Sequence, residues 1–224
     1  MNLPSRDHEH AHTPPLGFSK LTPVYDAAIA TFTRERVWRT RMVEEVAPQP
    51  GDLILDIGSG TGRLAVAIHF AQPGAEYLGV DPDESAVAIA RRRAARVGSS
   101  ASFDVKFFSG TEKIGERQPN KIISSLVLHQ TPLNEKRRII QTAYDTLPHK
   151  GLFIVADYGA QRSGLMKFLF RWTVQALDGV VNTQPNADGM LLSLIEDAGF
   201  ASPEESAVVP TVTGSISIFR ALKL

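Results

Sequence analysis

The chain has 224 residues, 43% of them hydrophobic, which suits one sizeable α/β domain rather than two. Lysine plus arginine and aspartate plus glutamate number 24 each, so the formal net charge is zero, and the basic character of a dedicated nucleic-acid-binding protein is lacking. The absence of cysteine excludes disulfides, thiolate metal sites and a cysteine nucleophile. No apolar run is long enough for a membrane span, and the first residues form no signal core. We therefore expect a cytoplasmic protein without membrane insertion, nucleic-acid partner or metal site.

Polar residues and prolines dominate residues 1–17, where we expect a disordered tail. Three histidines in this tail offer a metal-binding alternative, which the lack of further ligands in an ordered element nearby disfavours. From Thr22 to Val46 the apolar residues recur at helical spacing, and prolines and Gly51 end the pattern. We expect residues 18–50 to form a helical cap over the functional site of a single domain that spans 18–224.

Beyond the cap, apolar strand-like runs alternate with helical patterns, which indicates a parallel sheet with right-handed crossovers. Strands are expected near 52–57, 76–80, 103–108, 121–126 and 151–157, and helices near 61–70, 84–97 and 134–147.

The last third of the chain departs from this alternation. A helical pattern over 163–178, rich in large apolar residues, predicts an inserted helix after the fifth strand, and another helix is expected over 190–198. The strand-like segments 204–212 and 215–222 are joined by a short turn and predict a terminal hairpin. The expected fold class is therefore α/β, with a Rossmann-like, mostly parallel seven-stranded sheet that ends in an antiparallel hairpin.

A glycine-rich turn follows the first strand, with glycines at positions 58, 60 and 62. Glycine lets backbone N–H groups approach a ligand that a Cβ atom would exclude. The pattern is G-x-G-x-G followed by Arg63, so it departs from the G-x-G-x-x-G dinucleotide fingerprint, whose third glycine packs the helix on the strand. Ligands of open α/β sheets bind beyond the carboxyl ends of the strands, where the loops after the first four strands are expected to meet.

With Asp81 at the end of the second strand, this pattern resembles the class I S-adenosylmethionine (SAM)-dependent methyltransferases, over roughly residues 20–224. The resemblance implies SAM as cofactor, S-adenosylhomocysteine as product, and a glycine loop around the methionine part. It implies that Asp81 binds the ribose hydroxyls, with a helix N-cap as the alternative role. Asp56 either contacts the amino group of SAM, directly or through water, or fixes the loop by accepting backbone N–H bonds. The cofactor-binding residues so implied are Asp56, Gly58, Ser59, Gly60, Thr61, Gly62, Asp81, Pro82, Gly110, Thr111, Glu112, Ser125 and Leu126.

The loop after the third strand departs from the family pattern. The family usually carries an acid there that accepts from the adenine amino group, whereas this chain has Gly110-Thr111-Glu112. The acid is replaced by Gly110 or by Thr111, depending on alignment. A threonine hydroxyl or a backbone carbonyl is the expected substitute.

The segment after the fourth strand ends in Leu128-His129-Gln130 and sharpens the resemblance to the ubiquinone/menaquinone-biosynthesis methyltransferase branch. Tyr25-Asp26 ahead of the Trp38 helix also resembles that branch. His129 is the candidate catalytic residue, as a general base or as a group that orients the substrate. A capping or packing histidine is the alternative.

Methyl transfer from a sulfonium needs little side-chain chemistry, because the protein mainly aligns the acceptor and excludes water. A base is needed only if the acceptor loses its proton at or before transfer, and Asp157 and Tyr158 are then candidates beside His129. An apolar or aromatic acceptor is expected if the aromatic residues of the cap and the insertion face the cleft, although packing in the core is their more frequent role. The candidate substrate contacts are Tyr25, Trp38, Tyr158 and Trp172.

The sequence thus predicts an enzyme, a SAM-dependent methyltransferase that acts on a small organic acceptor. Three arginines, Arg36, Arg39 and Arg41, are candidates for holding an acidic substrate group, with a solvated helix face as the favoured alternative. The rival functions are a non-catalytic SAM-binding or partner-binding module and, less favoured, a dinucleotide-dependent oxidoreductase.

Overall fold

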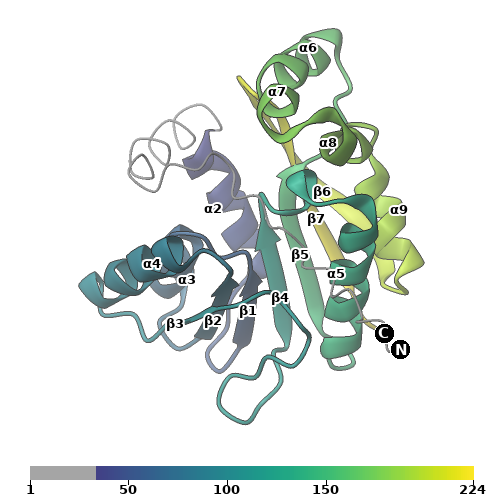
Figure 1. The fold of residues 1–224 in the computed structure, drawn as a ribbon. Helices are drawn as coiled ribbons and strands as arrows, with labels where there is room; N and C mark the ends of the chain where they lie inside the picture. The colour runs from purple at the N-terminus through teal and green to yellow at the C-terminus, as the bar shows by residue number, and fades with distance from the viewer. Residues whose placement is uncertain (1–33) are drawn as a thin grey trace, which may run out of the picture.

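A computed structural model describes residues 34–224. Its centre is a seven-stranded sheet in the order β3-β2-β1-β4-β5-β7-β6 (Figure 1). The strands β1 to β5 are mutually parallel, while β7 is antiparallel to both β5 and β6. The expected fold class and the terminal hairpin are therefore confirmed. The strands are β1 (Leu53–Ile57), β2 (Glu76–Asp81), β3 (Ser102–Val105), β4 (Lys121–Ser125), β5 (Leu152–Tyr158), β6 (Ala201–Thr211) and β7 (Gly214–Leu222).

Helices cover both faces of the sheet. The helices α2 (Glu35–Val46), α3 (Arg63–Ala71) and α4 (Glu84–Arg96) lie on one face, and α5 (Leu133–Thr146) and α9 (Met190–Asp197) lie on the other (Figure 1). Each face of the sheet has its own hydrophobic core, and alternate residues of β1 belong to one or the other. Ile54 belongs to the same core as Trp38 on the first face, and Leu55 to the same core as Ile140 on the second. Because β1 is covered on both sides, it appears in the sequence as one continuous apolar run.

The insertion after β5 consists of three short helices rather than the single helix expected over 163–178. They are α6 (Gly164–Trp172), α7 (Val174–Asp178) and α8 (Val180–Ala187). The first break falls at Thr173, where the backbone turns and Thr173 Oγ1 donates to Leu169 O at 2.6 Å. The second falls at Gly179, whose φ of 81° ends α7. The apolar residues keep their helical spacing across both breaks, so the sequence pattern gives no sign of them.

Two further differences lie near the carboxyl ends of the strands. The edge strand β3 ends at Val105 rather than at residue 108, because Lys106 N–H makes the last bond to β2, at Asp81 O, and the chain then leaves the sheet. A one-turn 3₁₀ helix, η1 (Leu128–Gln130), was not expected after β4.

The expected tail (1–17) and the first part of the expected cap (18–33) lie outside the described residues. The described part of the cap is α2, which packs on the sheet against β5 and beside α3. The cap and the domain boundaries stay predictions. Between residues 34 and 224, no helix combines the length and apolarity that a membrane crossing requires.

Candidate functional site

The site lies where the chain order of the strands reverses. From β1 the chain proceeds outward through β2 to β3, then returns to the other side of β1 with β4 and β5. A crevice opens at the carboxyl ends of the strands at such a point, and ligands of open α/β sheets bind there. The loops after β1, β2 and β4 therefore meet at one edge, as the sequence predicts.

The three glycines of the loop after β1 serve different purposes, although all have positive φ (71°, 51° and 74°). A Cβ atom on Gly58 would lie 2.3 Å from Val127 Cγ2, and one on Gly62 would lie 2.8 Å from Ala90 Cβ. The missing Cβ atoms at these two glycines let the loop pack closely against Val127 and against Ala90 of α4. Among residues 34–224, a Cβ atom on Gly60 would have no neighbour within 4 Å, so none of these residues covers this position. Gly60 is thus the glycine at which a ligand can approach the backbone.

Asp81, at the end of β2, braces the tip of this loop. Its Oδ2 accepts from the backbone N–H of Gly60 at 2.8 Å, and its Oδ1 accepts from Asp83 N–H at 2.9 Å. The N-cap of α4 is Asp83, which accepts from the N–H groups of Ser85 and Ala86. Asp81 is therefore not the capping residue, and its carboxylate lies beside the open side of Gly60 with Pro82 next in the chain. The neighbouring Thr61 accepts at Oγ1 from Arg93 at 2.7 Å, and Ser59 is buried.

Asp56 lies beneath the loop with no exposed surface and accepts a short hydrogen bond from the Tyr77 hydroxyl. Burial raises the pKa of Asp56 to about 7 against the opposing effect of the Tyr77 bond, with the Asp81 charge adding to the rise and Arg39 opposing it. Within residues 34–224, no hydrogen-bond partner is found for Asp56 Oδ1. The carboxylate therefore has an acceptor atom to spare, and the partner that it does have is a side chain rather than a loop amide.

The loop after β3 is closed on itself by Glu112. Its carboxylate is buried and accepts from the backbone N–H groups of Ser109 at 3.2 Å and Gly110 at 2.8 Å, and from Ser109 Oγ at 2.8 Å. These bonds and the nearby Lys106 lower the pKa of Glu112 although burial alone would raise it. The carboxylate is thus engaged within its own loop, whereas Thr111 is exposed, with its hydroxyl 2.8 Å from Ser109 Oγ.

The chain leaves β4 through Ser125 and Leu126. Leu126 adopts φ 55°, a left-handed conformation that is costly for a residue with a branched side chain. Its N–H remains bonded to Ala156 O at 2.9 Å, and the next residue, Val127, packs against Gly58. The strained turn therefore lies on the other side of β1 from Asp81, because β1 stands between β2 and β4 in the sheet.

His129 is buried between two carboxylates. Its Nδ1 lies 2.8 Å from Asp157 Oδ1, and its Nε2 lies 3.4 Å from Asp178 Oδ2 at the end of α7. Burial by itself would lower the pKa of His129, but the two carboxylates raise it to about 9. The imidazole is therefore a cation near neutral pH and has no free lone pair with which to take a proton.

Hydrogen bonds likewise hold the carboxylate of Asp157. Its two oxygens accept from the backbone N–H groups of Leu128, His129 and Tyr158 and from the His129 ring. Four donors therefore occupy both oxygens of this buried carboxylate. The structure therefore gives Asp157 the role of a structural acid at the strand end.

Of the four expected substrate contacts, the three that the structure describes do not come together. Trp38 is 1% exposed and packs in the core beneath the sheet face, and Tyr158 is 5% exposed, with its hydroxyl 2.8 Å from Thr213 Oγ1. Trp172 is 68% exposed on α6, and Tyr25 lies outside the described residues.

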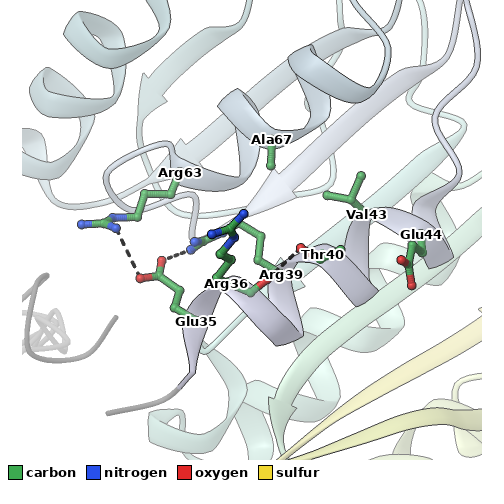
Figure 2. Close-up of a pocket in the computed structure, with 8 residues that line it drawn as sticks. All are labelled: Glu35, Arg36, Arg39, Thr40, Val43, Glu44, Arg63 and Ala67. Atoms are coloured by element: carbon green, nitrogen blue, oxygen red, sulfur yellow. Dashed lines mark hydrogen bonds and ion pairs between the residues drawn. The ribbon is translucent and has the colours of Figure 1, made fainter. Parts of the chain in front are cut away.

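A cleft of about 430 Å³ runs between α2 and α3, beside the glycine loop. Glu35 is one of the residues that line this cleft, and Figure 2 shows it between the guanidinium groups of Arg39 and Arg63, to which it is ion-paired. Burial lowers the pKa of Arg39, with Glu35 opposing the change. The sequence pattern did not reveal this cluster, because Arg63 is 28 residues away from Glu35 along the chain. Its sequence signal is limited to the unusual arginine that follows Gly62.

The sheet order, the glycine loop after β1 and the acid at the end of β2 together define a class I methyltransferase fold. In agreement with this, residues 55–153 match a family model described as a methyltransferase domain. The expected resemblance to a methyltransferase is thereby confirmed over these residues, and the curated relatives that follow extend the resemblance to the ubiquinone/menaquinone branch.

Among curated proteins, the chain is 36% identical over 88 residues to demethylmenaquinone methyltransferase of Thermus thermophilus, a match that covers 38% of this chain and 40% of that protein. It is also 36% identical over 83 residues to release factor glutamine methyltransferase of Deinococcus radiodurans, covering 37% of this chain and 28% of the relative. The matches thus span well under half the length of these relatives.

Solved structures share the fold over more of the chain. Magnesium protoporphyrin IX methyltransferase of Synechocystis, with bound S-adenosylhomocysteine, superposes with a TM-score of 0.64 at 20% identity, covering 92% of this chain and 96% of that one. Phosphoethanolamine N-methyltransferase 2 of Haemonchus contortus gives a TM-score of 0.63 at 14% identity over 83% of this chain and 52% of its own.

Proposed function

We propose that this protein is a SAM-dependent methyltransferase that acts on a small, apolar or aromatic organic acceptor. The observation that carries the proposal is the open side of Gly60, where backbone is accessible beside the Asp81 carboxylate. Polar backbone and a carboxylate at a strand-order reversal suit a ligand with hydroxyls and a charged end.

The residues of this edge fit SAM. Asp81 would accept from the ribose hydroxyls, and the loop from Gly58 to Gly62 would lie along the methionine part. The spare oxygen of Asp56 suits the ammonium group. Thr111 is an exposed polar side chain of this loop and would replace the missing acid at the adenine, because Glu112 is engaged with Ser109 and Gly110.

When bound, SAM supplies a methyl group that is already activated on a sulfonium. The task of the chain is to hold the acceptor in line and to keep water out. We infer that His129 orients the η1 turn beside the site rather than removing a proton, because both ring nitrogens face carboxylates. The proposed site therefore favours an acceptor that ionises on its own, such as a phenol or a quinol.

The names of relatives support an acceptor of this kind. A demethylmenaquinone methyltransferase and several ubiquinone/menaquinone biosynthesis C-methyltransferases are among the proteins to which the chain is similar. The large apolar side chains exposed on α6 and α7, Leu165, Phe168, Trp172 and Leu177, belong to the insertion that adjoins the site. We include Trp172 in the proposed acceptor surface and leave the acceptor atom open. A small-molecule partner and a cytoplasmic location belong to this proposal.

Calorimetric titration with S-adenosylhomocysteine is the first test, with NAD as the matched negative ligand. Binding of the former with a raised melting temperature is expected, since a ligand selective for the folded state stabilises it by mass action. Binding of NAD alone would favour the oxidoreductase.

Turnover then separates an enzyme from a non-catalytic module. Methyl transfer from SAM is measured with a panel of quinols, phenols and amines. Transfer to a quinol or phenol is expected, whereas cofactor binding without transfer to any panel member would favour the module.

A further inference from the structure

We propose that the outward face of α6 docks this protein on the surface of an anionic lipid bilayer. The outward face consists of Leu165, Phe168 and Trp172, which lie at positions i, i+3 and i+7 of the helix and therefore share one side of it. Their exposed fractions are between 59% and 68%, and the ring centroids of Phe168 and Trp172 lie 6.2 Å apart. The inference goes beyond the proposed function, and its test needs neither cofactor nor acceptor.

The opposite side of α6 is held by the protein. Phe170 is 1% exposed and packs against Tyr158 at the end of β5, with 5.2 Å between the ring centroids. Directly after the helix, Thr173 Oγ1 donates to Thr213 O at 3.3 Å, in the turn between β6 and β7. Because these contacts fix the rotation of the helix, its outward face points away from the hydrophobic core.

The exposed apolar surface continues past α6. Leu177 of α7 and both Val180 and Val181 of α8 are each more than half exposed. Figure 1 shows α6 and α7 beyond the carboxyl end of β5. Large exposed apolar side chains gathered on one segment are typical of a surface that binds a partner or a membrane.

Two cations lie beside the outward face. Lys167 and Arg171, one helical turn apart, line a cleft of about 390 Å³ between α6 and α8, and Val180 lines the same cleft. Asp188 also lines it, and its carboxylate accepts from a glutamine of α8 at 2.8 Å. Within residues 34–224, neither cation is in an ion pair. The cleft therefore presents two exposed positive charges next to apolar surface.

The charge of the whole segment has one sign. Residues 159–177 contain three basic and no acidic side chains, whereas the complete chain is neutral. The third basic residue, Arg162, is ion-paired with Glu205, so Lys167 and Arg171 carry the charge that is not compensated within the segment. An anionic surface complements this charge.

The chemistry of α6 favours a bilayer over a second copy of the chain. A helix with Trp, Phe and Leu on one face and Lys and Arg beside them is typical of a helix that lies in a membrane interface. Anionic headgroups attract such cations, and aromatic rings lie at headgroup level. A two-fold contact between copies would instead bring both pairs of cations together. The contact is peripheral, since no helix within 34–224 suits a membrane crossing.

Tryptophan fluorescence reports the docking directly, because the chain has two tryptophans and only Trp172 is exposed, while Trp38 is buried. The full chain is mixed with phosphatidylcholine vesicles that either contain or lack phosphatidylglycerol. Vesicles with phosphatidylglycerol should shift the emission to shorter wavelength, and acyl-chain-brominated lipid should quench it. Trp172→Phe should lose this signal.

Vesicle sedimentation then measures the contribution of the charges. Lys167→Gln combined with Arg171→Gln should lower partitioning onto the phosphatidylglycerol vesicles by about 10- to 30-fold, because each cation near an anionic surface contributes about fivefold. Arg92→Gln combined with Arg96→Gln is the matched control, since these two arginines are also exposed and one turn apart, on α4. The control should leave partitioning unchanged.

The apolar contribution has its own matched pair. Leu165→Gln combined with Phe168→Gln should lower partitioning by about 10-fold or more, because buried apolar area drives interfacial binding. Phe70→Gln removes an aromatic side chain that is 70% exposed on α3 and should have no effect. Near-native circular dichroism shows that each variant is folded.

Equal partitioning of the wild-type chain onto both kinds of vesicle, or none onto either, would overturn the inference, and this comparison needs no variant. Equal losses in the α6 and α4 arginine and lysine pairs would also overturn it. Acrylamide quenching of the free protein tests two other occupants of the outward face. If Trp172 is shielded from acrylamide, residues 1–33 or a second copy cover the face, and light scattering distinguishes these two cases; either would overturn the inference.

Discussion

The free energy of unfolding should fall as the pH rises from 6 to 9.5, and replacing His129 by glutamine should remove a large part of this fall. In the folded chain the pKa of His129 is about 9, because Asp157 and Asp178 favour the imidazolium. The unfolded chain has the ordinary value of about 6.5. The folded pKa is the higher one, so the stabilisation is fully present below pH 6.5 and is lost as the pH rises through 9.

The size of the effect follows from the two pKa values. One pKa unit corresponds to about 1.4 kcal/mol, so the protonated ring contributes about 3 kcal/mol to the free energy of unfolding at low pH. The wild-type chain should lose about that much more than His129→Gln between pH 6 and pH 9.5. Asp56 and Lys136 also titrate with shifted pKa values, but they remain in both proteins and their effects largely cancel in the difference.

Urea unfolding of both proteins at a series of pH values measures this difference directly. Glutamine is chosen because it keeps a donor toward Asp157 and avoids leaving that buried carboxylate unpaired. Asp178→Asn should give an intermediate result, since the nearer partner Asp157 remains. Parallel pH profiles for wild type and His129→Gln would refute the assignment of an imidazolium between two carboxylates.

Three further predictions concern the proposed cofactor site. Gly60→Val should abolish S-adenosylhomocysteine binding and leave the circular dichroism spectrum near-native. Gly58→Ala places a Cβ atom against Val127 and should therefore lower the free energy of unfolding, measured by chemical denaturation, by about 1–3 kcal/mol. Asp81→Ala should weaken S-adenosylhomocysteine and methylthioadenosine alike by about 1–3 kcal/mol in calorimetry, because both contain the ribose; an unchanged dissociation constant would remove Asp81 from the site. Asp56, with its pKa raised to about 7, should release a proton when an ammonium group binds beside it at pH 7. The release makes the binding enthalpy depend on the buffer, and Asp56→Asn should abolish this dependence. The same buffer dependence in wild type and variant would count against the contact.

The sheet was predictable because its strands are buried on both faces and appear as continuous apolar runs between glycine- and proline-rich turns. The edge strand β3 was overestimated because Phe107 and Phe108 continue the apolar run after the backbone has left the sheet. Trp38 illustrates the limit for aromatic residues: the helical spacing placed it on an apolar face, and that face packs on the sheet core.

The glycine loop was placed correctly by its spacing, but the spacing does not distinguish Gly60 from its two neighbours. That distinction depends on Val127 and Ala90, which belong to other loops and helices. The ion pairs of His129 with Asp178 and of Glu35 with Arg63 join residues on separate elements. Their proximity follows from the packing of the insertion and of α2, which no local pattern specifies.

Lys136 of α5 links the insertion to η1 through hydrogen bonds. This buried side chain, on the first turns of α5, donates its three N–H bonds to the carbonyls of Leu128, His129 and Asn182, and the last of these belongs to α8. An ammonium group has three donors, so none is left over. Exchanging the α6–α8 segment for one of another shape would leave a charged group buried with an acceptor missing, which is strongly destabilising. Engineering a new acceptor preference into this protein therefore requires residues 128–136 and the insertion to be redesigned as a single unit.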